Sequence, residues 1–282
     1  MNKIAIFTDS VADLSDEIKE QYDIISIPHY VRFDYEIYQD GVNLNAEELY
    51  QIIKEKKKIP RITSSRFEDF IRIFERYLNF GYDILYIGVG SKLSIAYQNA
   101  VMTKEQVNPK RIFVVDSGSL SSGLAILVLK AVVMRDHAVP IEIIQQRLTK
   151  LVPKVKTQFA LKTTDYLVVN KKMNALAGFA SKMVGYKPIF NVSFGHLEHY
   201  KKSFGQMKKT VSVMLDELFE SILYLDLEYI VVTHSLANRE ILYMIEQIDK
   251  RIPSIKVVET NVGCVLATEC GPGVVGLSYI TV

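Results

Sequence analysis

The sequence predicts an α/β protein of two domains: an N-terminal domain with a doubly wound parallel sheet, and a C-terminal α/β domain with a mixed sheet. The chain has 282 residues, which is longer than a typical single domain. In its first half, short and continuously apolar segments alternate with amphipathic ones, as in a parallel sheet that helices cover on both faces. After Pro140 the predicted strands outnumber the helices that could connect them, which indicates a mixed sheet.

The first half alternates strand and helix. Strands are predicted at 3–8, 24–28, 84–88 and 111–116. Helices are predicted at 13–22, 46–56, 67–80, 93–105 and 122–135. Ser10 or Asp13 would cap the first helix, and the aromatic segment 31–38 would form a small hairpin.

The second half begins with a predicted helix at 141–151, which ends before Pro153 because proline cannot continue a helix. Strands are predicted at 155–161, 166–169, 189–192, 229–233, 255–259 and 274–282. Further helices are predicted at 173–183, 206–223 and 239–249. We place the domain boundary so that residues 1–153 form the first domain and residues 154–282 the second.

Charge and cysteine content narrow the class of protein. The 34 basic and 32 acidic residues leave a formal charge of +2, whereas a dedicated nucleic-acid binder would carry a concentrated basic face. Cys264 and Cys270 share one apolar segment and are expected to be buried free thiols, not a disulfide framework or a zinc site. The sequence shows no signal peptide and no apolar run of about 18 residues, so we expect a cytoplasmic protein without a transmembrane segment.

Three loops rich in hydroxyl groups follow predicted strands and precede helices: 63–65, 88–94 and 116–123. Ligands of doubly wound sheets bind at the carboxyl ends of the strands, and helix N-termini there offer N–H groups to an anion. Each loop alone is explained as a helix cap, but together they can converge on one anionic group. None of them matches a phosphate-binding P-loop or a GxGxxG fingerprint, so nucleotide binding is not supported.

Residues with catalytic or metal-binding patterns are few. His196 and His199 lie three apart without a third ligand nearby, and we interpret them as surface histidines. Asp9 and Asp116 each end a predicted strand and precede a serine, a position where loop hydrogen bonds explain an aspartate better than a metal does. No G-x-S-x-G elbow is present. We therefore predict no catalytic residue and no metal site, and keep a hydrolase or transferase acting at the Ser and Asp loops as the alternative.

Several stretches resemble motifs of the DegV family. Residues 6–14 resemble I-x-T-D-S-x-A-D-L, and 63–64 resemble the start of T-S-Q-P. Residues 91–100 resemble S-x-L-S-G-T-Y-Q-x-A, 114–117 resemble V-x-D-S, and 271–276 resemble G-P-G-x-x-G. The resemblance spans nearly the whole chain, with the motifs in the family's order.

The resemblance implies a function. Members of this family are similar to bacterial fatty-acid-binding proteins, in which a long acyl chain lies in a cleft between two domains and the carboxylate is presented to a separate fatty acid kinase. By matching position, Thr63, Ser64 and Ser94 would hold the carboxylate and Ser91 would shape the same loop. The family implies no cofactor besides the bound fatty acid, no metal and no chemistry by the carrier itself. We expect a monomeric lipid-binding protein of this kind.

Two departures from the family pattern fall in the site. The arginine of K-G-G-R-I becomes Lys172, which keeps the charge but loses the bidentate fork. The histidine of H-T-G-P-G becomes Glu269, and two carboxylates about 4 Å apart repel by about 4 kcal/mol at an effective dielectric near 20. Glu269 would then be protonated and donate to the acid, or pair with Lys172 or Arg66, or the ligand would not be an ordinary fatty acid.

Two rival hypotheses have structural signatures. An enzyme would place Ser94 within hydrogen-bond reach of a base that a third group holds in turn. An interaction module with a vestigial pocket would have side chains filling the cleft between the domains.

Overall fold

The computed structural model describes residues 3–169 and 185–282. The predicted helix at 173–183 and Lys172 lie outside these residues. The described chain forms a four-stranded sheet of order β2-β1-β6-β7, a six-stranded sheet of order β10-β9-β8-β13-β11-β12 and a three-stranded sheet of order β4-β3-β5. In the described ranges, none of the helices has the length and apolar character needed to cross a membrane.

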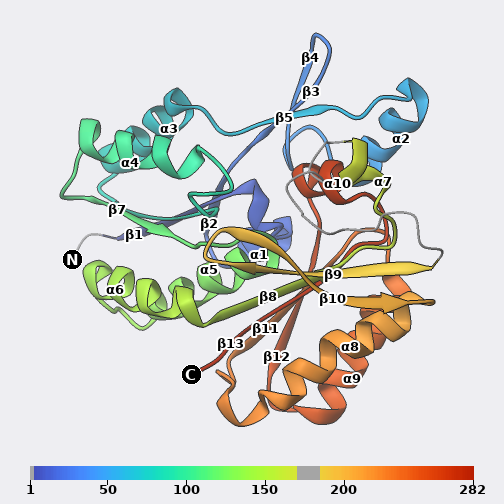
Figure 1. Cartoon of the computed structure of the whole chain (residues 1–282). Helices are drawn as coiled ribbons and strands as arrows, with labels where there is room; N and C mark the ends of the chain where they lie inside the picture. Colours follow the sequence, from blue (N-terminus) through green and yellow to red (C-terminus); the bar gives the residue numbers. More distant parts are fainter. Residues whose placement is uncertain (1–2, 170–184) are drawn as a thin grey trace.

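The four-stranded sheet is parallel throughout. Its strands are β1 (Ile4–Asp9), β2 (Ile24–Ile27), β6 (Asp83–Gly88) and β7 (Ile112–Asp116). Figure 1 shows one helix pair above this sheet and another below it. These pairs are α3 (Phe67–Asn79) with α4 (Ala96–Val107), and α5 (Ser121–Asp136) with α6 (Ile141–Leu151). The predicted doubly wound sheet is therefore confirmed.

The six-stranded sheet is mixed: β11 and β12 are parallel, and the other neighbours are antiparallel. Its strands are β8 (Val155–Ala160), β9 (Tyr186–Ser193), β10 (His196–Phe204), β11 (Tyr229–His234), β12 (Lys256–Asn261) and β13 (Val275–Ile280). Two helices pack on one face, α8 (Met207–Glu220) and α9 (Asn238–Arg251). The other face packs on α5, which therefore contacts both large sheets and is buried along most of its length.

The three-stranded sheet is antiparallel and joins β3 (Tyr30–Phe33) to β4 (Glu36–Gln39) and β5 (Arg61–Thr63). The hairpin predicted at 31–38 is therefore confirmed. The third strand, β5, was not predicted, because it has only three residues and pairs with a strand about 30 positions earlier in the chain. Helix α2 (Ala46–Lys56) follows the hairpin.

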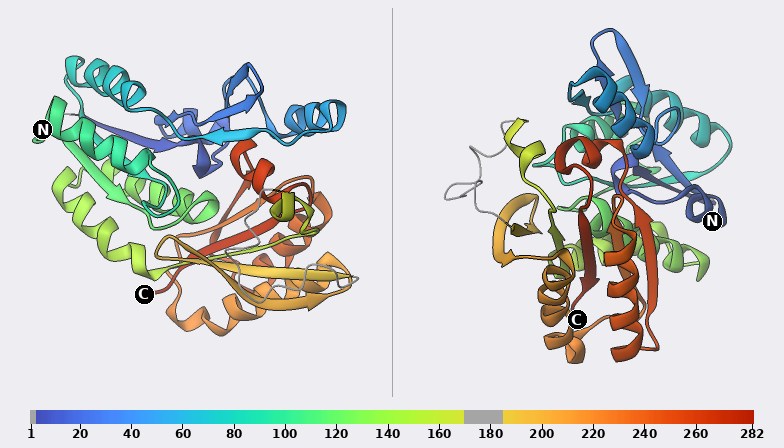
Figure 2. Two further views of the ribbon diagram at one scale, coloured as in Figure 1. Left: turned by 45° about the horizontal axis from the view of Figure 1, so that its top comes forward. Right: turned by 90° about the vertical axis from the view of Figure 1, so that its right-hand side faces the viewer.

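A short helix, α10 (Cys264–Cys270), lies between this small sheet with α2 and the mixed sheet, as both views in Figure 2 show. Its residues pack against α2, β3 and α7 (Asp165–Val169). Residues of α10, β3, α2 and the mixed sheet form one shared apolar core. Two apolar clusters, this one and the core around α5, therefore each contain residues from both halves of the chain.

Two predictions about local structure were wrong. The first helix is α1 (Asp16–Gln21), and Ser15 caps it instead of Ser10 or Asp13. A 3₁₀ turn at Ser10–Ala12 intervenes and leaves Asp13 at φ 55, a left-handed conformation in which it ends that turn. The segment predicted as a strand at 166–169 is helical and belongs to α7. Just before it, Thr163 Oγ accepts a hydrogen bond from the Asp165 N–H, a local side-chain turn that competes with an extended backbone.

Helix α4 also begins later than predicted, at Ala96 instead of 93. The N–H groups of Leu93 and Ser94 both donate to the Gly90 carbonyl, which keeps these residues in a turn. Ser94 Oγ then accepts from the Ala96 N–H at 3.2 Å. The serine therefore stands in the loop before the helix, with its hydroxyl group beside the first turn.

Candidate functional site

A cavity of about 280 Å³ lies between the parallel-sheet half of the chain and the mixed sheet. Most of its lining is apolar and comes from both halves, including Val89, Leu93 and Leu120 on one side and Phe159 and Leu266 on the other. A mostly apolar lining with a few polar groups is characteristic of small-molecule sites. The cleft is therefore open, in contrast to the filled cleft expected of a vestigial pocket.

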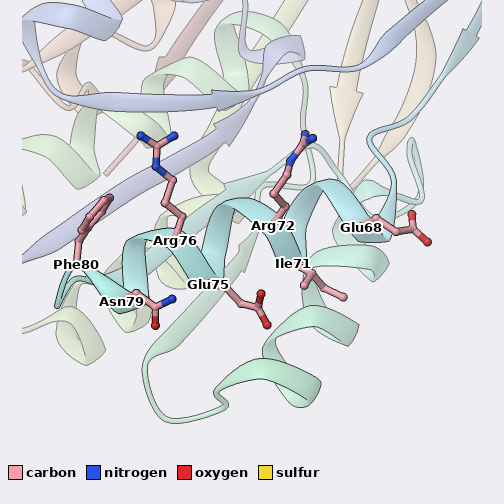
Figure 3. Close-up of a pocket in the computed structure, with 7 residues that line it drawn as sticks. All are labelled: Glu68, Ile71, Arg72, Glu75, Arg76, Asn79 and Phe80. Carbon is pink, nitrogen blue, oxygen red and sulfur yellow. The ribbon is translucent and has the colours of Figure 1, made fainter.

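A second hollow, drawn in Figure 3, runs along the outer face of α3. Acidic and basic side chains, Glu68, Arg72, Glu75 and Arg76, alternate along this exposed helix, and Phe80 at its end is 66% exposed. Among the described residues, the lining of this hollow includes none of the predicted site residues and no buried polar group. It is the ordinary charged face of a surface helix.

Three loops bring hydroxyl and imidazole groups to one corner of the cavity. Ser64 follows β5, Ser94 precedes α4, and His29 lies between β2 and β3. The Ser64 and Ser94 hydroxyl oxygens are 2.7 Å apart, and His29 Nε2 is 3.4 Å from Ser94 Oγ. A compact polar cluster thus interrupts an otherwise apolar wall.

Hydrogen bonds on the far side of the imidazole fix its tautomer. Ser65 Oγ donates to the Pro28 carbonyl at 2.8 Å and lies 3.1 Å from His29 Nδ1. A hydroxyl group has only one proton to donate, so Ser65 accepts from the N–H at Nδ1. Burial lowers the pKa of His29 to about 4, so the ring is neutral near pH 7 and Nε2 is an acceptor that faces Ser94.

The structure brings some of the predicted site residues together. Ser64, Ser94 and Glu269 all line the cavity, Glu269 from α10. Thr63 is the exposed last residue of β5 and does not line the cavity. Ser91 is also absent from the lining; its N–H donates to Asp116 Oδ1 at 3.0 Å.

His29 is the residue that the sequence-based reasoning missed. A single histidine after Pro28, at the end of a predicted strand, gives no periodic or motif signal. Its position at the carboxyl end of a parallel strand was the available clue, because ligands of doubly wound sheets bind at that edge. Its neighbours Ser65 and Ser94 lie 36 and 65 positions away in the chain.

Asp9 and Asp116 hold the loops that border the site, as predicted. Asp9 Oδ2 accepts from the Val89 N–H at 2.7 Å and from the Tyr86 hydroxyl at 2.8 Å. Burial raises the pKa of Asp9 to about 7. Asp116 Oδ1 accepts from the N–H groups of Ser91 and Gly118. Across residues 3–169 and 185–282, no three His, Cys, Asp or Glu side chains are grouped so that they could hold a metal ion.

Two further buried aspartates fix the start of α10. Asp13 Oδ1 accepts from the Gly263 N–H at 2.9 Å, and Asp40 Oδ1 accepts from the Cys264 N–H at 2.7 Å. Asp13 also accepts from the Ser121 hydroxyl at 2.5 Å. Burial raises the pKa of Asp13 to about 8 and also raises that of Asp40. The helix that carries Glu269 is therefore attached to the N-terminal half.

Comparisons with known proteins agree with this architecture. A family model described as uncharacterised protein, DegV family, matches residues 3–282. A DegV domain-containing protein of Clostridium acetobutylicum is 32% identical over 284 residues, which cover 99% of each chain. A protein of Thermotoga maritima named fatty acid-binding protein is 26% identical over 284 residues, covering 97% of this chain and 96% of its own.

Solved structures show the same fold. The crystal structure of a DegV lipid binding protein from Thermotoga maritima matches with a TM-score of 0.86 at 25% identity, covering 99% of both chains. The Streptococcus pneumoniae fatty acid kinase (Fak) B3 protein, loaded with linoleic acid, matches with a TM-score of 0.83 at 20% identity, covering 99% of this chain and 100% of that one. The family match extends over nearly the whole sequence, and a relative above 30% identity covers the full length. This chain belongs to the DegV family.

Proposed function

We propose that this protein binds a long-chain fatty acid in the cavity between its two halves and acts as a carrier without chemistry of its own. The carboxylate is held by Ser64 and Ser94, and the acyl chain lies among the apolar residues of the wall. The observation that carries the proposal is the pair of hydroxyl groups, 2.7 Å apart, in one corner of an otherwise apolar cavity.

The energetics favour an acyl chain. Burial of each CH₂ group contributes about 0.8 kcal/mol, so a sixteen-carbon chain gains roughly 10 kcal/mol before the cost of immobilisation. Hydroxyl donors to a carboxylate form charge-assisted bonds that fix the orientation of the acid. The α4 N-terminus next to Ser94 adds a favourable dipole for an anion.

The remaining predicted residues have supporting roles in this proposal. Thr63 ends β5 and so sets the position of Ser64, and Ser91 holds its loop through Asp116. Glu269 stands on the cavity wall, where it either shares a proton with the acid or pairs with a cation such as Lys172. Measuring the fatty acid affinity of Glu269→Gln and of Lys172→Gln would separate these two roles.

The proposal includes a protein partner. The pneumococcal protein with the same fold is named as a component of fatty acid kinase and was solved with linoleic acid. By this likeness, the carrier presents the bound carboxylate to a separate kinase, which phosphorylates it. The polar corner made by Ser64, Ser94 and His29 is the part of the site that such a kinase has to reach.

One observation favours a hydrolase as a second candidate. Ser94 contacts His29, and His29 contacts Ser65, as a nucleophile, a base and an orienting group would. The contact between serine and imidazole is long at 3.4 Å, however, and the third group is a neutral hydroxyl that cannot stabilise an imidazolium as a carboxylate does. Hydrolysis of an acyl ester that is lost in Ser94→Ala would favour this candidate over the carrier.

The test of the carrier function is mass spectrometry on an organic extract of the purified, denatured protein. We expect a near-stoichiometric long-chain fatty acid from the wild type and its loss from a Ser64→Ala/Ser94→Ala double variant. Ser212→Ala, which removes a hydroxyl from α8 on the other face of the mixed sheet, is the matched control and should retain the lipid. An empty extract from wild type that also takes up no added fatty acid would reject the proposal.

A further inference from the structure

The hydrogen bonds of the polar corner show which of its atoms carry a proton. With Nδ1 protonated by its bond to Ser65, His29 Nε2 is an acceptor, and the Ser94 hydroxyl donates to it. The two lone pairs of Ser94 Oγ then accept from the Ala96 N–H at 3.2 Å and from the Ser64 hydroxyl at 2.7 Å. Both serine protons are therefore engaged within the cluster, and neither is directed at a ligand.

One added proton on the imidazole changes which groups donate and which accept in the whole cluster. When Nε2 carries a proton, it donates to Ser94 Oγ, whose lone pairs are then filled by Nε2–H and the Ala96 N–H. Ser94 no longer accepts from Ser64, and it no longer donates to the ring. Both hydroxyl protons become available at once, one for each oxygen of a carboxylate.

Resting on the proposed fatty-acid binding, we propose that His29 is the proton-accepting group of this site: a carboxylate binds at Ser64 and Ser94 together with one proton, which resides on His29 Nε2. The overall step is RCOO⁻ plus H⁺ plus the neutral protein giving a complex of carboxylate and imidazolium. No bond of the ligand is broken, and the proton comes from solvent.

The charges around the cavity support this assignment. A buried carboxylate is costly unless a cation or several donors compensate it. Within the described part of the chain, the cavity lining contains no lysine or arginine; its titratable groups are His29, Glu269 and the thiol of Cys270. The imidazole is thus the described group there that can become a cation.

The groups around His29 include hydroxyls, carboxylates and one guanidinium, that of Arg66, which lies 5.1 Å from the centre of the Tyr30 ring. The His29 N–H donates to Ser10 Oγ, and Ser10 donates to Asp40. Next to it, the Tyr30 hydroxyl donates to Asp69. On the α4 side, Asn99 donates to the Ser65 carbonyl. Burial lowers the pKa of free His29, so the ring is neutral before a ligand binds. A bound carboxylate raises the pKa of His29, because it adds a negative charge beside the ring.

The experiment is isothermal titration of delipidated protein with oleate below its micelle concentration, at pH 7.5, in two buffers with different ionisation enthalpies. The difference between the observed heats gives the protons taken up per oleate. We expect a value near one for wild type and near zero for His29→Gln, which cannot titrate but still reaches Ser94. Glu269→Gln should keep a value near one. The wild-type association constant should fall about tenfold per pH unit above neutrality, until the pKa of the bound imidazole is reached.

Each outcome decides a different point. Tight oleate binding without proton uptake overturns the role of His29 but leaves the carrier function intact, and it is also the result expected if Lys172 is the counter-ion. Proton uptake that disappears in Glu269→Gln and persists in His29→Gln assigns the proton to Glu269. Absence of oleate binding by the wild type rejects the proposed function itself. If His29→Gln does not fold, ¹⁵N NMR of the wild-type histidines serves instead, because protonation of His29 Nε2 on oleate addition is required.

Discussion

At the scale of single residues, the site depends on which of two neighbouring hydroxyls faces the cavity. Thr63 and Ser64 both match the family motif, but Ser64 lines the cavity and contacts Ser94, whereas Thr63 is exposed at the end of β5. Successive residues of an extended chain point to opposite sides. Sequence matching therefore cannot choose between adjacent serine and threonine residues, and the strand geometry can.

This difference gives a direct prediction for affinity. Ser64→Ala removes a hydroxyl from the carboxylate corner and should weaken fatty acid binding about tenfold or more, since a hydrogen bond to a charged group contributes about 1.5–3 kcal/mol. Thr63→Ala changes an exposed side chain and should alter binding by less than about twofold. Displacement of a fluorescent fatty acid measures both. A larger loss in Thr63→Ala than in Ser64→Ala would show that the wrong hydroxyl has been assigned.

At the scale of elements, the short helix α10 contributes more than half of its residues to the lining of the cavity. Its seven residues include Val265, Leu266, Glu269 and Cys270, all in the lining. Helices this short are not stable alone, so contacts at both ends hold it. The buried aspartates fix its first turn, and Gly271 ends it at φ 73 and ψ −178, a conformation open essentially only to glycine.

Gly271→Ala should therefore destabilise the protein and reduce lipid retention together. An added Cβ would lie 2.4 Å from the Tyr166 ring, and the backbone would be strained, for a combined cost of about 2–4 kcal/mol. Gly81→Ala is the matched control, because its φ is 85 but nothing lies within 4 Å of the added atom; we expect a cost of about 1 kcal/mol and normal lipid content. Denaturant unfolding and lipid extraction measure the two effects. Equal destabilisation by both variants would contradict the role of the contact with Tyr166.

At the scale of the whole molecule, buried acids near the interface of the two halves link stability to pH. Burial raises the pKa of Asp9 to about 7 and that of Asp13 to about 8. Between the ordinary aspartate pKa and these values, the folded state holds protons that the unfolded state has released. Stability from these groups is thus complete at low pH and is lost as pH rises toward 8. Burial lowers the pKa of His29 to about 4, which has the opposite effect but only below about pH 6.5.

A test should therefore cover pH 6.5 to 8, where His29 does not change the pH dependence of stability. The free energy of unfolding should fall with pH there, by at most about 1.4 kcal/mol per pH unit for each aspartate. Asp13→Asn, which is neutral at every pH, should flatten the part of the curve between pH 7 and 8. Urea titrations of delipidated protein at several pH values provide the measurement. A wild-type stability that rises across this window would contradict the pKa directions of both aspartates.

The sequence by itself determined the fold class, the order of most strands and helices, and the loops that carry Ser64 and Ser94. These features depend on local signals: apolar runs and amphipathic periods in elements such as β6 and α3, and hydroxyls at helix starts. The order of the motifs along the chain indicated the family. The domain boundary at 153/154 and the role of Lys172 stay predictions.

Only the tertiary structure decided which groups meet. It turned Ser64 and not Thr63 into the cavity, made β5 a strand through pairing with β3, and attached α10 to Asp13 and Asp40. It also brought His29 to Ser94 across 65 positions of sequence and fixed its tautomer through Ser65. These contacts join residues whose separation in the chain carries no periodic signal, so only the folded structure shows them. For His29, Asp13 and Asp40, the burial that results from these contacts also shifts the pKa.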